Sequence, residues 1–252
     1  MGADTLSDVL KTVRLTGATF FDVVAKAVTE GRCFAAIFGE EPIALEAGEV
    51  IVFTNADPHA LSSSPGMRAD SVATAPLDIA SGGQLPFFLN YGGDGPISAK
   101  FVCGYLACYA QPFNPLLENL PPVIKTGDPQ HADEGWLGQF LRFAMMEAAE
   151  KRAGGESVLA KLSELMFIEV VRRHLERLPP EQAGWLAGLR DPFVGKALSL
   201  LHGAPAQNWT IEKLAKQVGL SRSVLAERFA DLVGIPPMQY LSNGGCRSHR
   251  GG

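Results

Sequence analysis

The chain has 252 residues, of which 46% are hydrophobic and 19% are charged, so it can bury the core of one or two domains. This composition, with no glycine period and no persistent heptad array, excludes disorder, collagen and coiled coil as dominant states. The net charge is −5, but the part from Asp191 onward carries seven cationic and four acidic side chains, which leaves −8 for residues 1–190. An acidic body with a basic end is typical of a chain whose C-terminal module binds a polyanion.

The start of the chain has no basic segment followed by an apolar one, and no apolar run approaches 18 residues. We therefore expect a cytoplasmic protein with no leader and no membrane partner. The four cysteines form no C-x-x-C pair and have no histidine at zinc-finger spacing. They are expected to be reduced structural thiols.

Apolar residues at helical spacing predict a short amphipathic helix over residues 5–15. From about residue 18 to 110, short apolar runs alternate with glycine and proline, for example at 33–38, 50–54 and 100–108. Strands at such intervals predict a small antiparallel barrel or sandwich.

After Pro121 and Pro122 the apolar residues return at helical spacing, first from Trp136 and again from Val158, which predicts a helical hairpin. Both helices are apolar on more than one stripe, so we expect the surplus face to mediate homodimerisation. The apolar side chains that suggest this are Phe140, Leu141, Phe143, Leu165, Phe167, Ile168 and Val171.

A further helix is expected from Pro192 to about Leu201, ahead of a segment with the spacing of a helix-turn-helix. In that segment Thr210 and Ser221 can each cap a helix, and Gly219 supplies the positive φ of a tight turn. The expected buried positions are Ile211, Leu214, Ala215 and Val218 on the first helix and Leu225 and Phe229 on the second, with the small Ala215 at the crossing.

Residues 209–215, 220–225, 228–229 and 233–241 together resemble the AraC/XylS family of bacterial transcriptional regulators. In that family they form the first of two helix-turn-helix units, and 238–241 begin the helix that joins them. The resemblance implies sequence-specific binding to DNA, with RNA polymerase as a further partner. Residues 242–252 have no helical pattern, so we expect a flexible basic tail at the end of a truncated DNA-binding domain.

The resemblance also implies roles for single residues of the second helix. Ser223, Ala226 and Glu227 occupy the outward positions that meet bases, and Arg222 contacts a phosphate. Family members often carry a basic residue in place of Glu227. A carboxylate there must either accept from cytosine N4 or repel phosphate.

Residues 45–59 combine a strand, a glycine turn, a second strand and a Pro58-His59 corner. Together with 29–34, 102–106 and 114–117 they resemble the cupin barrel that is fused to AraC-type regulators. Metal-dependent cupins use several histidines and a carboxylate, whereas His59 has no histidine partner in this region. We therefore expect no metal and no other cofactor, and His59 either caps its turn or binds a ligand in the barrel.

The sequence thus predicts an α+β protein with a cupin-like antiparallel β-barrel at 1–125, a helical dimerisation region at 126–188, a helix-turn-helix at 189–241 and a tail at 242–252. The expected function is transcriptional regulation in response to a small molecule bound in the cupin domain. No Ser/His/Asp order, phosphate loop or carboxylate pair suggests catalysis. The alternative is a metal-free cupin that binds small molecules or partners and has lost DNA binding with the second unit.

Overall fold

The computed structural model describes residues 14–16, 23–55, 57–67, 96–109, 115–129, 135–150, 152–179, 184–204 and 206–242. The chain divides into two compact units. We call Leu15–Cys108 with Pro121–Val170 the sheet unit, and Met1–Arg14, Tyr109–Leu120 and Val171–Gly252 the helical unit.

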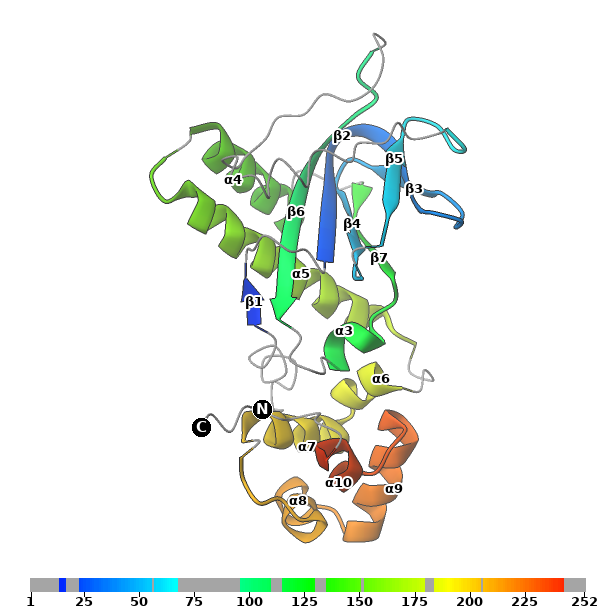
Figure 1. Ribbon diagram of the computed structural model, residues 1–252, viewed down its shortest axis with the longest axis vertical. Coiled ribbons are helices and arrows are strands. Elements are labelled where there is room, and N and C mark those ends of the chain that lie inside the picture. The colour runs from blue at the N-terminus through cyan, green and yellow to red at the C-terminus, as the bar shows by residue number, and fades with distance from the viewer. Residues whose placement is uncertain are drawn as a thin grey trace. The chain divides into compact units, whose positions relative to one another are not determined.

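The elements follow one another in an α+β order, with most strands first and most helices last (Figure 1). They are β1 (Arg14–Thr16), β2 (Val23–Ile37), β3 (Ile43–Glu46), β4 (Glu49–Phe53), β5 (His59–Ser62), β6 (Ala99–Tyr109), α3 (Pro115–Asn119), β7 (Val123–Gly127), α4 (Trp136–Glu150), α5 (Gly155–Arg177), α6 (Trp185–Arg190), α7 (Pro192–Gly203), α8 (Ile211–Val218), α9 (Arg222–Val233) and α10 (Pro237–Tyr240).

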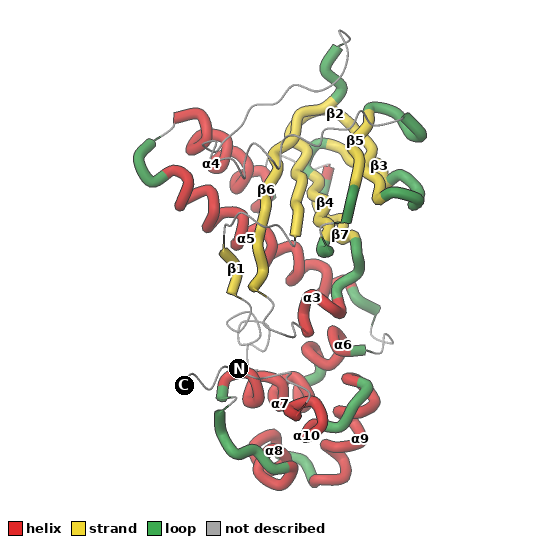
Figure 2. Tube along the Cα trace, viewed as in Figure 1, coloured by secondary structure: helices red, strands yellow, loops and turns green. Residues whose placement is uncertain are grey.

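The long strand β2 organises a curled sheet of seven strands, ordered β1-β6-β2-β4-β7 with β3 and β5 added along β2 (Figure 2). Its first half pairs antiparallel with β4 and β6, and its second half with β3 and β5. A register shift between Val28 and Glu30 separates the two halves, and such bulges increase strand bending and twist. The antiparallel barrel predicted from the sequence is therefore confirmed as a half-barrel.

One face of this sheet carries a compact apolar core, which extends from the first half of β2 to the second. Strand β4 is buried along its whole length, so both faces of the sheet are covered there. Helix α4 contacts β2. The fully enclosed members of the core are Val28, Cys33, Ala35, Leu45, Ile51 and Phe53.

Helices α4 and α5 confirm the two consecutive helices expected after residue 121, and Gly154, with φ +85°, lies in the short turn between them. The apolar residues of the two helices fall into a buried set and an exposed set. Leu141, Phe167 and Val171 are buried within the chain itself, so they belong to the stripe that packs inside the chain and not to the surplus face. Large apolar side chains that remain exposed include Phe143, Met145 and Met146 of α4 and Leu165 of α5.

The first predicted helix, over residues 5–15, lies mostly outside the described residues. Its last part is wrong, because Arg14–Thr16 forms strand β1. Residues 243–252 of the predicted tail also lie outside the described residues. The short helices α3 and α6 had no sequence signal of their own, since one or two turns do not establish a 3.6-residue period.

In the helical unit, α6, α7, α8 and α9 pack around one apolar core, and α10 contacts α9. The hydroxyl of Tyr240 accepts a hydrogen bond from Trp185 Nε1 at 3.2 Å and lies 2.9 Å from His202 Nε2. His202 is therefore a buried packing residue. The contacts of Tyr240 connect α10 to α6 and α7, so the helices of this unit are joined through one polar cluster as well as by apolar packing.

None of the helices in the described ranges is long and apolar enough to cross a bilayer.

Candidate nucleic-acid interface

The two helices of the predicted helix-turn-helix begin at the predicted caps. Thr210 Oγ1 accepts a hydrogen bond from Lys213 N, and Ser221 Oγ accepts one from Val224 N, each at 3.3 Å. Both caps have extended backbone, as an N-cap requires, and satisfy one of the free N–H groups of the first helical turn. Local sequence alone therefore sets where α8 and α9 start.

The turn between the helices also follows the prediction. Gly219 adopts φ 85° and ψ 27°, a left-handed conformation that costs glycine little, and its N–H bonds to Ala215 O. The expected inward residues of both helices are buried with one exception. Ile211 is only partly buried, because it lies in the first turn of α8 at the edge of the unit, and its assignment to the core was wrong.

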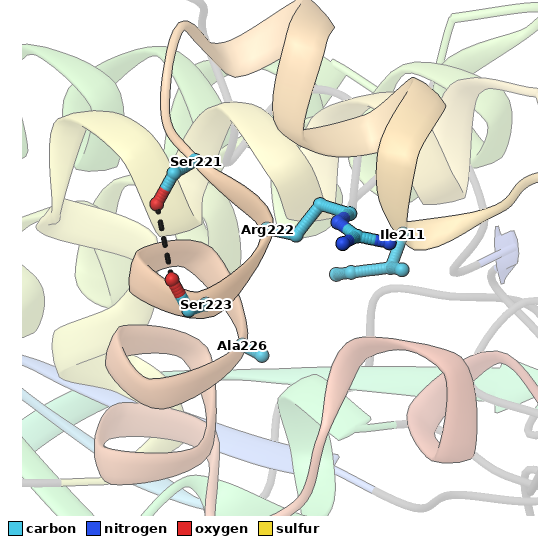
Figure 3. A pocket seen from close by; sticks show the side chains of 5 residues that line it. All are labelled: Ile211, Ser221, Arg222, Ser223 and Ala226. Carbon is cyan, nitrogen blue, oxygen red and sulfur yellow. Dashed lines mark hydrogen bonds between the residues drawn. The ribbon is translucent and has the colours of Figure 1, made fainter.

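Ile211 instead lines a shallow open hollow of about 470 Å³, which it forms together with the first turns of α9 (Figure 3). The other lining residues are Ser221, Arg222, Ser223 and Ala226. Three of the four residues proposed from the sequence to meet DNA therefore lie around one concavity. Glu227 is exposed on α9 as well, but it is not among the residues that line the hollow.

Arg222 is held in place by a residue that the sequence did not single out. Its Nη1 donates to Glu212 Oε1 at 2.9 Å, and both side chains are more than half exposed. The hydrogen bond from Arg222 is the largest cause that lowers the pKa of the Glu212 carboxyl, so this carboxylate is charged at neutral pH. Glu212 thus orients the guanidinium and partly neutralises it. Ten residues separate the pair, so neither helix alone shows it.

Chemically, the hollow offers the groups that hold a phosphate in an oriented way. A guanidinium donates two parallel hydrogen bonds to phosphate oxygens, and the hydroxyls of Ser221 and Ser223, 3.2 Å apart, are further donors. The first-turn N–H groups of α9 add a partial positive charge at the same end. A phosphate would compete with Glu212 for Arg222.

The sheet unit contains the other residue proposed from the sequence, His59. Its Nδ1 donates to Asp57 O at 2.8 Å, which agrees with the turn-capping alternative, and its ring stacks on Phe53 with centroids 4.0 Å apart. Burial lowers the pKa of His59, and the positive charge of Lys26 lowers it further, while the bond to Asp57 opposes both effects. His59 is therefore neutral at pH 7, with its proton on Nδ1.

The described residues do not fit the metal site of a metal-dependent cupin. No group of three or more His, Cys, Asp or Glu side chains in the described ranges is placed to hold an ion. His59 uses Nδ1 for a backbone carbonyl, which leaves a single imidazole nitrogen, and one donor does not make an Fe or Mn site.

Known proteins match this chain over its sheet unit and over most of its length. The family model described as a cupin matches residues 25–176. A putative AraC-like transcription regulator of Streptomyces antibioticus is 36% identical over 224 residues, which cover 86% of this chain and 69% of the relative. A second, of Streptomyces lividans, is 34% identical over 230 residues, with the same coverage.

The chain belongs to the AraC-like transcription regulators that carry a cupin domain. The regulator AlkR of Acinetobacter baylyi is also similar, at 34% identity over 132 residues, which cover 51% of this chain and 42% of that protein. No solved structure matches the chain. The names of these three relatives describe regulators of transcription and no enzyme.

Proposed function

We propose that this AraC-like regulator binds specific DNA sequences through α8 and α9, and that its sheet unit binds a small organic effector without a metal. One observation supports the proposal that the protein binds DNA. Arg222, Ser223 and Ala226 surround a single open concavity at the start of α9, with Glu227 exposed on the same helix. A helix exposed in this way can enter a major groove while its first turn meets the phosphates.

Different residues of α9 then have different roles. Arg222 contacts the phosphate backbone and contributes affinity for any sequence, whereas Ser223, Ala226 and Glu227 meet base edges and set the preference. Glu227 accepts a hydrogen bond from cytosine N4 where that base is present. His59, in the wall of the sheet unit, contributes to the effector site.

We further propose that the regulator is a cytoplasmic homodimer and not an enzyme, with effector binding at 1–125, dimerisation at 126–188 and the helix-turn-helix at 189–241. The exposed apolar side chains Phe143, Met146 and Leu165 support the dimer, because isolated apolar side chains of this size are stabilised when a partner covers them. Contact with RNA polymerase is the expected route to activation.

Selection of genomic DNA fragments by the purified 252-residue chain tests the DNA function. Bound fragments should share a sequence, and log Kobs should fall linearly with log salt concentration. Arg222→Ala should weaken all bound fragments by a similar factor and reduce the salt slope by about 1. Lys100→Ala is the matched control, since it removes one cation from the sheet unit, where Lys100 pairs with Glu30.

Substitution of the base-contacting positions should give a different result. Ser223→Ala and Glu227→Gln should change which fragments are enriched, with about 1–3 kcal/mol of discrimination at the base pair concerned. If no fragment is enriched even at low salt, the DNA-binding proposal is wrong. If Arg222→Ala and Lys100→Ala weaken binding equally, the assignment of Arg222 is wrong.

A further inference from the structure

The hollow at the start of α9 has an apolar part that contact with a phosphate does not explain. Ile211 of α8 and Ala226 of α9 line it together with three polar side chains, and both are only partly buried. Figure 3 shows Arg222 extending from α9 toward Ile211, with the methyl group of Ala226 directed toward the same space. Apolar side chains give a phosphate no hydrogen bond, so this part of the hollow fits a different group.

The fold brings this apolar pair together from two helices. The Thr210 cap makes Ile211 the first residue of α8, so its side chain lies at the edge of the unit. Ala226 is four positions after Arg222 and therefore lies one turn further along the same side of α9. The hydrogen bond from Arg222 to Glu212, at 2.9 Å, joins the first turns of the two helices. Both apolar side chains are thus held beside the same ion pair.

An apolar surface with a polar and charged rim is typical of a binding site. DNA offers two kinds of apolar surface to a protein, the C5-methyl group of thymine in the major groove and the deoxyribose of the backbone. Ala226 is three positions after Ser223 and directly precedes Glu227, and we have proposed that these residues meet base edges. A group beside Ala226 therefore lies inside the groove, where the thymine methyl is the apolar group available.

The remaining bases are poor partners for this pair of side chains. Guanine, adenine and cytosine present hydrogen-bond donors and acceptors to the major groove and no methyl group. Two apolar side chains would take water from those polar atoms without replacing its hydrogen bonds. A thymine methyl loses only water that it gains by losing, because its burial against Ile211 and Ala226 is favourable.

We propose that Ile211 and Ala226 form the binding site for the C5-methyl group of one thymine in the DNA sequence that this regulator recognises. The inference rests on the proposed binding of DNA through α8 and α9, and it assigns a base to this part of the site. It also makes Ile211, which lies outside the recognition helix, a specificity-determining residue.

Replacement of single thymines by deoxyuridine tests the inference, because it removes the methyl group and keeps every hydrogen-bonding group of the base. One duplex from the DNA selection is made with each thymine replaced in turn, and fluorescence anisotropy measures its affinity for the 252-residue chain. One replacement should weaken binding by about threefold to fivefold, the value of one buried methyl group. The protein is unchanged in this comparison, so its folding cannot affect the result.

Protein variants then assign the methyl group to the hollow. Ile211→Ala should reduce the difference between thymine and deoxyuridine at that position to less than about twofold. Val224→Ala is the matched control, since Val224 is an apolar side chain of α9 that is 46% exposed but is not among the residues that line the hollow. The control variant should keep the full difference.

A methylated cytosine gives a second, independent measurement. With a C·G pair at the same position, the duplex that carries 5-methylcytosine should bind about threefold to fivefold more tightly than the duplex that carries cytosine. Equal binding of the two duplexes would contradict a methyl site at this position.

Three results of the variant experiments would overturn the inference. Deoxyuridine could have no effect at any position, or Val224→Ala could abolish the difference as Ile211→Ala is expected to do. Ile211→Ala could instead weaken the thymine and deoxyuridine duplexes by the same factor, which would show that Ile211 packs on deoxyribose or only supports α8.

These results are distinguishable from failure of the proposed function. A chain that enriches specific fragments but binds thymine and deoxyuridine duplexes equally refutes the methyl site and leaves the DNA-binding function standing. A chain that enriches no fragment refutes both proposals.

Discussion

Arg228 of α9 and Asp191, the N-cap of α7, form the ion pair that fixes the candidate recognition helix to the helical unit. Arg228 donates from Nε at 2.8 Å and from Nη2 to the same oxygen, Oδ2. The other oxygen, Oδ1, accepts from the backbone N–H groups of Phe193 and Val194 at 3.0 and 2.9 Å. The Asp191 carboxylate thus caps the N-terminus of α7 and also binds Arg228 of α9. The exposed face of α9 therefore has a defined orientation.

Asp191→Ala should lower the free energy of unfolding by about 2 kcal/mol, because it removes the cap of α7 and leaves Arg228 without its partner. Arg228→Ala should cost about 1 kcal/mol or less, since the Arg228 side chain is 45% exposed and the cap remains. Urea unfolding of the two variants and the wild type measures both values. Equal effects of the two substitutions would contradict this account of Asp191.

Acid should remove the contribution of Asp191. Burial raises the pKa of this carboxyl, but hydrogen bonds from Arg228 and from two backbone N–H groups outweigh burial and lower the pKa below its ordinary 3.8. The unfolded state is protonated first, so the stabilisation is present above pH 3.8 and is lost as the pH falls further. Asp191→Asn should therefore be less stable than the wild type at pH 6, and the difference should shrink below pH 3.8.

Glu212→Gln should strengthen DNA binding by the regulator, because it frees Arg222 from its carboxylate partner and removes a negative charge next to the phosphate. We expect a gain of about threefold to tenfold that is similar for all bound fragments. Fluorescence anisotropy with one selected fragment measures it. The double variant Glu212→Gln/Arg222→Ala should lose most of the gain, and a gain that survives in full would show that Glu212 acts by another route.

The dimer should depend on the exposed apolar side chains of α4 and α5. Phe143→Lys with Leu165→Lys should convert a dimer into a monomer at micromolar concentration in sedimentation velocity, because each places a charge where the partner would cover an apolar surface. Phe38→Lys is the matched control, since Phe38 is 78% exposed in the turn after β2. A wild type that is monomeric at this concentration would refute the dimer.

His59 should make the stability of the protein depend on pH. Burial lowers the pKa of His59 in the folded state below the ordinary 6.5 of the unfolded state. Between the folded and the unfolded pKa the unfolded state binds the proton, so the free energy of unfolding falls as the pH is lowered from 6.5. His59→Phe keeps a ring on Phe53 but does not titrate, and should reduce this pH dependence. Part of it should remain, because burial also lowers the pKa of His174. Denaturant unfolding from pH 7.5 to 5 checks both points.

The local features of the helix-turn-helix were determined by the sequence itself. The caps and the turn of α8 and α9 bond to groups within four residues of themselves, at Thr210, Ser221 and Gly219. The local sequence therefore predicts where these helices begin and where α8 ends. Strand and helix periods in the same way predicted the half-barrel and the pair α4 and α5. The helix expected near Arg14 fails because a short apolar pattern cannot tell a helical turn from an edge strand.

Only the tertiary structure decided which distant residues meet. Helix packing brings together Arg228 and Asp191, which are 37 positions apart, and strand register brings together Lys26 and Cys103, which are 77 apart. No periodic pattern in the sequence predicts either contact. The same holds for the apolar residues of α4 and α5. A leucine that packs inside its own chain and one that remains exposed have identical side chains, and the fold alone assigns Leu141 to the core and Leu165 to the surface.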